Sequence, residues 1–233
     1  MTAEEPRFQP PDRSTGDLVH TAVKAALGSI PLLGAAAAEL FALVVAPPLE
    51  KRRSEWMREV GEALSRAHAE KAIDLEQAAQ NDTFIDTALQ ASQIALRNHQ
   101  DEKLQALRNA VVNAAAPEAP SVSLQQFFLR LVDEFTVWHL RLLRLFQGPE
   151  AWFAEHGISW PNLYMGGLSH VVEAAFPELR GRRDLYDQFW RDLYLRGMVA
   201  TEHLHTTMTG GGLTSKRTTE LADQFLRFVT NRV

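Results

Sequence analysis

The sequence predicts a mainly α-helical protein, with an N-terminal helical bundle followed by a winged-helix-like α+β domain. Three observations predict this fold. Apolar residues recur at three- and four-residue spacing along most of the chain, whereas strand-like alternation is confined to residues 198–217. The segment PEAP at 117–120 carries two prolines and cannot continue a helix. We therefore expect a helical domain at 17–116, a linker at 117–120 and a winged-helix-like domain at 121–233.

The N-terminal region begins with a segment that has no helical pattern. Residues 1–16 have acids and prolines where a secretory signal needs a basic and then an apolar region, so we expect a disordered lead-in. A first helix is predicted over 17–28 and a second over 31–46, closed by Pro47 and Pro48. Pro48 also fits the first turn of a third helix.

Either two further helices or one long kinked helix is predicted before the linker. Asn81 or Asp82 is a good N-cap, and an apolar face follows from Phe84. The apolar phase slips near 98–99 and a new stripe starts at Leu104, which indicates a helix pair or one kinked helix.

The second half is predicted to contain four more helices, then a hairpin and a closing helix. Three helices are expected to begin after the capping residues Ser123, Thr136 and Asp184, and another is expected over 167–175. Gly197 should end the helix that begins after Asp184. Residues 198–208 alternate with a period of two, GGG at 210–212 provides a turn, and 213–217 could return as a second strand before a closing helix. Three helices followed by such a hairpin are the order of a winged-helix domain.

The apolar segment 30–48 raises the question of a membrane, because Glu39 is its only charge. A helix over 31–46 is about 24 Å long, short of a hydrocarbon core of about 30 Å. Glu39 near its middle costs about 2.5 to 3.5 kcal/mol in a bilayer. Small residues fall at every fourth position and form a stripe for close helix packing: Gly34, Ala38, Ala42 and Ala46. We expect a buried central helix and no permanent membrane span.

Nucleic-acid binding is possible but not favoured. The expected third helix of the winged-helix domain, DLYDQFWRDLYLRG, has three aspartates against two arginines and would repel phosphate. Four basic residues beside that helix and near the wing are the candidate nucleic-acid contacts: Arg182, Arg183, Lys216 and Arg217. We favour a winged helix that contacts protein.

The sequence gives no sign of catalysis. The chain has no cysteine, which excludes disulfides and thiol chemistry, and it lacks the common hydrolase, metalloprotease and nucleotide-binding motifs. His203 and His205 alternate onto one face of the expected strand, but Glu202 would point to the opposite face, so we expect no metal site. We expect no catalytic or cofactor-binding residues and no cofactor.

Four segments within residues 28–147 resemble an uncharacterised family of helical bacterial proteins: IPLLGAAAAELF, APPLEKRR, NDTFIDTALQASQIALRNHQDEKLQALRNA and FTVWHLRLLRLFQ. The end of the chain, TTELADQFLRFV, resembles the helix after the wing in many winged-helix domains. The resemblance implies a bacterial origin and a helical, non-membrane fold. It implies no activity and no catalytic residues.

Together these features predict a non-enzymatic interaction or regulatory module that acts through protein contacts. It would serve in the cytoplasm as an accessory of a bacterial response or defence system, with a protein partner or by self-association. Two alternatives stay open. One is a winged-helix transcriptional regulator, and the other is a triggered membrane-perturbing effector that uses the apolar segment 18–46.

Overall fold

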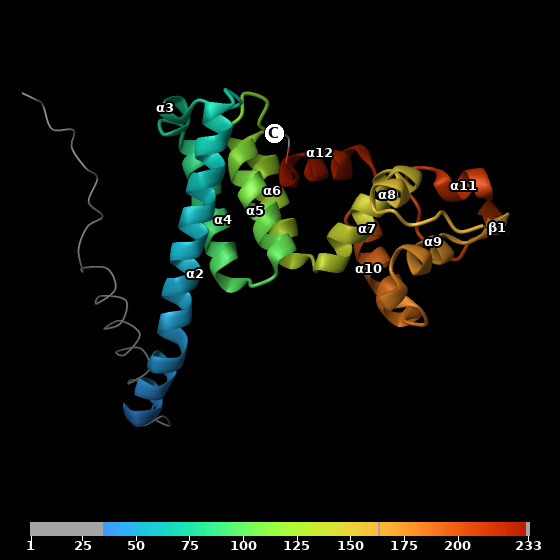
Figure 1. The fold of residues 1–233 in the computed structure, drawn as a ribbon, viewed down its shortest axis with the longest axis horizontal. Coiled ribbons are helices and arrows are strands. Elements are labelled where there is room, and N and C mark those ends of the chain that lie inside the picture. Colours follow the sequence, from blue (N-terminus) through green and yellow to red (C-terminus); the bar gives the residue numbers. More distant parts are fainter. Residues whose placement is uncertain (1–34, 163, 232–233) are drawn as a thin grey trace, which may run out of the picture. The chain divides into compact units, whose positions relative to one another are not determined.

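The computed structural model describes residues 35–162 and 164–231 (Figure 1). This part of the chain is mainly α-helical, as predicted. The chain divides into two compact units between Met57 and Arg58, inside helix α2 (Ala35–Ala69). The predicted lead-in at 1–16 and helix at 17–28 lie outside the described residues.

Helix α2 is longer than predicted. The expected end at Pro47 and Pro48 is wrong, because α2 continues through both prolines to Ala69. Neither proline has an N–H to donate, so the helix lacks two backbone hydrogen bonds there. The residues on both sides favour a helix, and the two predicted helices join into one. In the predicted small-residue stripe, Gly34 lies outside the described residues, Ala38, Ala42 and Ala46 lie in α2, and Ala42 is buried.

Three helices of the larger unit, residues 58–233, lie side by side (Figure 1). The helices are α4 (Asp82–Arg97), α5 (Asp101–Ala114) and α6 (Val122–Glu134), and the short α3 (Leu75–Ala78) precedes them. The predicted helix pair is therefore confirmed. Its first cap is confirmed too, since the Asn81 side chain accepts hydrogen bonds from the backbone N–H groups of Thr83 and Phe84.

The remaining helices follow in the second half of the chain. They are α7 (Val137–Gln147), α8 (Pro149–Glu155), α9 (Leu168–Ala175), a 3-10 turn (Pro177–Leu179), α10 (Arg183–Leu195), α11 (Gly210–Thr214) and α12 (Glu220–Val229). Thr136 caps α7 as predicted, and His139 accepts a reciprocal hydrogen bond from the Thr136 backbone N–H at 3.0 Å. Gly197 follows α10 with a positive φ of 69°, as a C′ glycine should.

Two predicted caps are wrong. Helix α6 begins at Val122, so Ser123 lies in its first turn, and Ser121 holds the N-cap position without a side-chain cap hydrogen bond. Helix α10 begins at Arg183, so Asp184 lies in its first turn. Both helices thus begin one residue before the expected capping residue.

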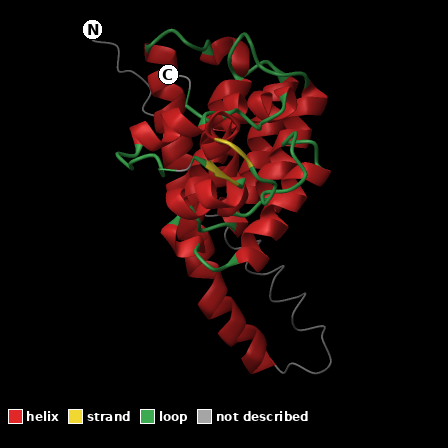
Figure 2. Cartoon of the chain, turned by 90° about the vertical axis from the view of Figure 1, so that its right-hand side faces the viewer, coloured by secondary structure: helices red, strands yellow, loops and turns green. Residues whose placement is uncertain are grey.

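The predicted hairpin over 198–217 is also wrong. The strand pair joins β1 (Met165–Gly166) to β2 (Met208–Thr209) in antiparallel register and is drawn in yellow in Figure 2. The glycine run does not form a turn, because the Thr209 hydroxyl accepts a hydrogen bond from Gly212 N–H at 3.4 Å and opens α11. Among the described residues, the one other strand-like pairing is an isolated antiparallel bridge between Val199 and Thr218. The winged-helix topology is therefore not confirmed.

A cluster of phenylalanines connects the two halves of the larger unit. The Phe128 ring on α6 lies 5.6 Å from the Phe225 ring and 5.8 Å from the Phe228 ring, both on α12. Helix α12 also packs on α5. Helices from both sides of 117–120 thus share one core. The division into two domains at 117–120 stays a prediction.

None of the helices within 35–162 and 164–231 combines the length and the apolar character needed to cross a membrane.

Candidate functional site

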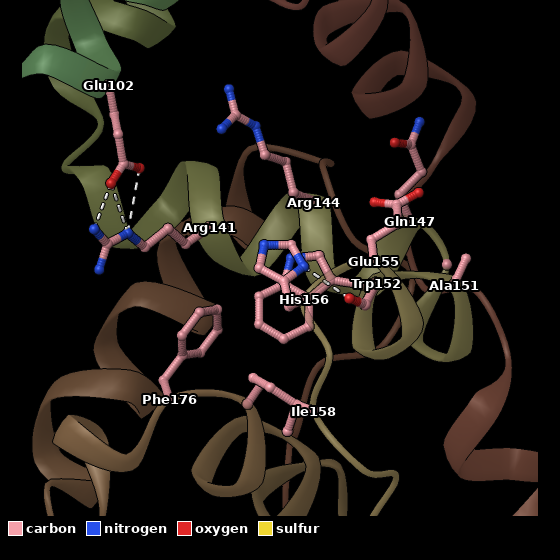
Figure 3. A pocket seen from close by; sticks show the side chains of 12 residues that line it. Glu102, Arg141, Arg144, Gln147, Ala151, Trp152, Glu155, His156, Ile158 and Phe176 are labelled. Carbon is pink, nitrogen blue, oxygen red and sulfur yellow. Dashed lines mark hydrogen bonds and ion pairs between the residues drawn. The ribbon is translucent and has the colours of Figure 1, made fainter.

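A cavity of about 680 Å³ lies between α7, α8 and the end of α9 in the larger unit (Figure 3). Its volume is within the usual range of about 300–1,000 Å³ for small-molecule sites. Arg141, Arg144 and Gln147 of α7 line it with Trp152 of α8 and Phe176. Aromatic rings and charged groups therefore meet in one hollow.

The charge of Arg141 is already compensated. Its Nε donates to Glu102 at 2.9 Å, and a second carboxylate, on Glu178, lies 3.7 Å from its Nη1. The hydrogen bond from Arg141 to Glu102 raises the pKa of the guanidinium, against the opposing effect of burial. The guanidinium also lies over the Trp138 ring at 4.9 Å. Arg141 thus connects α5 and α7 and adds little free charge to the cavity.

Arg144, one turn further along α7, has no such compensation. Its Nε is buried and makes no hydrogen bond within the described residues, and no ion pair is found for it there. Figure 3 shows the contrast, since dashed lines join Arg141 to Glu102 and none reaches Arg144. A buried donor without a partner costs about 1–3 kcal/mol. Arg144 is therefore a half-buried cation that lines the cavity and has no compensating partner among the described residues.

Helix α8 and the residue that follows it contribute a pair of stacked rings to the cavity. The His156 ring stacks on the Trp152 ring with a centroid distance of 3.8 Å and an interplanar angle of 17°. His156 Nδ1 lies 2.7 Å from the Trp152 carbonyl, and because a carbonyl only accepts, Nδ1 carries the hydrogen. In the neutral imidazole, Nε2 is then an acceptor. The Trp152 ring also meets Phe176 edge to face at 5.2 Å, which fixes the platform.

The four candidate nucleic-acid contacts all have partners within the chain. Arg182 lies 3.9 Å from Asp184, and Arg183 lies 3.2 Å from Asp187. Lys216 pairs with the buried carboxylate of Asp223, and Arg217 donates to the Gly212 carbonyl. A phosphate would have to compete with these partners at each position. None of the four lines the cavity.

The two histidines of the expected strand do not share one environment. His205 Nε2 lies 2.7 Å from Asp187 Oδ1 on α10, whereas the exposed His203 lies 3.7 Å from Glu202. Glu202 was expected to point away from His203, and this expectation is wrong because residues 200–207 do not form a strand. Sequence reasoning missed the partnership of His205 with Asp187, because it depends on how α10 packs.

Sequence reasoning also missed Arg144 and His156. Arg144 interrupts the apolar helix LRLLRLF as Arg141 does, and the pattern alone cannot tell which arginine has a carboxylate partner. The two carboxylates that pair with Arg141, those of Glu102 and Glu178, lie on other elements than α7.

Comparisons with protein families, with curated proteins and with solved structures found no match. The resemblance to helical bacterial proteins is thus supported only by the helical content of the structure.

Proposed function

We propose that this chain is a non-enzymatic interaction or regulatory module that acts through protein contacts. One observation carries the proposal: the adjacent residues Tyr164 and Met165 are 94% and 59% exposed. Tyrosine and methionine are enriched in protein interfaces, and tyrosine is among the residues that contribute most to binding energy. Such a pair in solvent favours a partner that covers it.

The backbone that carries this pair is ordered by hydrogen bonds. The Tyr164 carbonyl accepts a hydrogen bond from Gly210 N–H at 3.2 Å, and Met165 is paired with Thr209 across the two strands. An exposed side chain on a fixed backbone loses less conformational entropy on binding than one on a loose loop. This preorganisation supports a contact surface around β1.

The two alternatives have less support. A DNA-binding regulator would use Arg182, Arg183, Lys216 or Arg217, and each already has an internal partner. A membrane effector would use the segment 18–46, most of which lies outside the described residues. The same proposal includes a bacterial origin, a cytoplasmic location, self-association and a winged-helix-like C-terminal part.

The test is capture of the partner by the full-length chain in an extract of its native host. The unchanged chain should retain its partner on the capture resin. The double variant Tyr164→Ser with Met165→Ser should not retain it. The matched control is Leu195→Ser, because Leu195 on α10 is 70% exposed and lies outside β1. Equal recovery with the double variant would contradict the proposed surface.

The non-enzymatic part of the proposal has a separate test. Purified protein should neither hydrolyse nucleotides nor cleave nucleic acids. A turnover that a single substitution abolishes without unfolding the chain would overturn this part of the proposal.

A further inference from the structure

We propose that the cavity beside α7 and α8 binds a small molecule that joins a flat ring to one anionic group, a carboxylate or a phosphate. Arg144 would hold the anion, and the ring would stack on His156. This inference does not depend on the protein contacts at Tyr164 and Met165, which do not line the cavity.

The anion is assigned from Arg144. Its side chain is half-buried, its Nε has no hydrogen-bond partner among the described residues, and it lines the cavity. A guanidinium presents its donors in a planar fork that matches the two oxygens of a carboxylate or a phosphate. Arg141 cannot take this role, because Glu102 occupies the Nε side of its fork. The anion therefore belongs at Arg144.

The flat ring is assigned from His156. One face of its imidazole is covered by Trp152 at 3.8 Å, and the residue is nonetheless exposed and lines the cavity. The hydrogen bond from Nδ1 to the Trp152 carbonyl holds the ring in place. A third flat ring can extend this stack, since offset-stacked rings attract one another.

The charge of Glu155 gives a further prediction about the affinity of the cavity for an anion. It lines the same cavity, its side chain is exposed, and its negative charge opposes that of an anionic ligand. Replacing Glu155 with glutamine keeps its size and removes the charge. The change should therefore strengthen the binding of an anion, which a general disturbance of the cavity would not do.

The experiment is an NMR titration of the full-length chain with benzoate, followed on the indole N–H of Trp152. A ligand of this size is expected to bind with a Kd of about a millimolar. Arg144→Gln should weaken binding at least about tenfold, and Glu155→Gln should strengthen it. Arg191→Gln is the control, because Arg191 is an exposed arginine of α10 that does not line the cavity, and it should leave the Kd unchanged.

Two further probes separate the roles of charge and shape. Benzyl alcohol keeps the ring without the charge, and cyclohexanecarboxylate keeps the charge without the flat ring, so both should bind more weakly than benzoate. Inorganic phosphate should compete with benzoate for Arg144. The proposal is overturned if benzoate does not perturb the Trp152 resonance, or if the folded Arg144→Gln variant binds it as well as the unchanged chain. An unchanged or weaker affinity in Glu155→Gln would also count against it.

Discussion

The side-chain amide of Asn113 on α5 donates a hydrogen bond to the backbone carbonyl of Phe228 on α12 at 2.8 Å. The same nitrogen lies 2.9 Å from the Thr230 carbonyl. The last carbonyls of a helix have no partner within the helix, so Asn113 satisfies groups that would otherwise be buried unpaired. Asn109, one turn earlier, donates to the Val229 carbonyl at 3.2 Å. Helix α5 thus caps the end of α12 from the side.

We predict that Asn113→Ala lowers the free energy of unfolding by about 1–3 kcal/mol, because it removes the donor and leaves buried carbonyls unsatisfied. Asn113→Asp should be at least as destabilising, since a carboxylate cannot donate to a carbonyl. Urea denaturation at neutral pH measures both. The exposed Asn162→Ala is the control and should leave the midpoint unchanged. A midpoint for Asn113→Ala that equals the control would contradict the capping role.

A second prediction concerns Gly167, which precedes α9. A Cβ at this position would lie 2.7 Å from the Leu204 carbonyl oxygen and 3.1 Å from the His205 Cα, both of them backbone atoms. Gly167→Ala should therefore destabilise the protein by about 1–3 kcal/mol. Gly61→Ala is the matched control, because Gly61 lies in α2 and nothing is within 4 Å of its added Cβ. Thermal unfolding should show a higher midpoint for Gly61→Ala, since alanine favours the helix.

A third prediction concerns His139, which is buried against Phe135 with a ring centroid distance of 4.8 Å. Burial lowers the pKa of His139, and the nearby Asp192 opposes this only in part. The unfolded chain therefore takes up a proton near pH 6.5 that the folded chain binds only at lower pH. The free energy of unfolding should fall as the pH drops through about 6.5.

The check is a series of urea denaturations between pH 5 and pH 7. His139→Gln should reduce the slope of stability against pH, whatever its effect on stability at neutral pH. The exposed His99→Gln should leave the slope as it is. Equal slopes in all three proteins would exclude His139 as the titrating group.

A fourth prediction concerns Asp223, whose buried carboxylate accepts hydrogen bonds from Lys216 and, at 2.7 Å, from the Thr218 hydroxyl. Burial by itself would raise the pKa of Asp223, but the bonds from Lys216 and Thr218 outweigh it and hold the pKa below its usual value. The resulting stabilisation is complete above the unfolded pKa of about 3.9 and is lost as the pH falls through the lower folded pKa.

Asp223→Asn should therefore lower the free energy of unfolding by about 1–3 kcal/mol at pH 7. The difference from the unchanged chain should shrink as the pH falls below about 4. Denaturant titrations at several pH values measure this difference. A difference that is constant with pH would show that the charge of Asp223 does not contribute.

The sequence predicts those features of the fold that depend on neighbours a few residues apart. The cap at Asn81, the cap at Thr136 and the positive φ of Gly197 each involve groups within four residues of one another. Local rules also fail, at the caps expected from Ser123 and Asp184 and at the prolines Pro47 and Pro48, through which α2 continues. There the helical preference of the flanking residues outweighs the loss of two hydrogen bonds.

The sequence by itself determined the helical class and the position of most helices, because an apolar stripe with caps is written in consecutive residues. Only the tertiary structure decided that β2 pairs with β1 and that α12 is capped by Asn113. It also decided that Arg141 has a carboxylate partner, whereas Arg144 has none within the described part of the chain. Each of these relationships joins segments far apart in the chain. Their selection depends on how whole helices pack and on which buried polar groups then find partners.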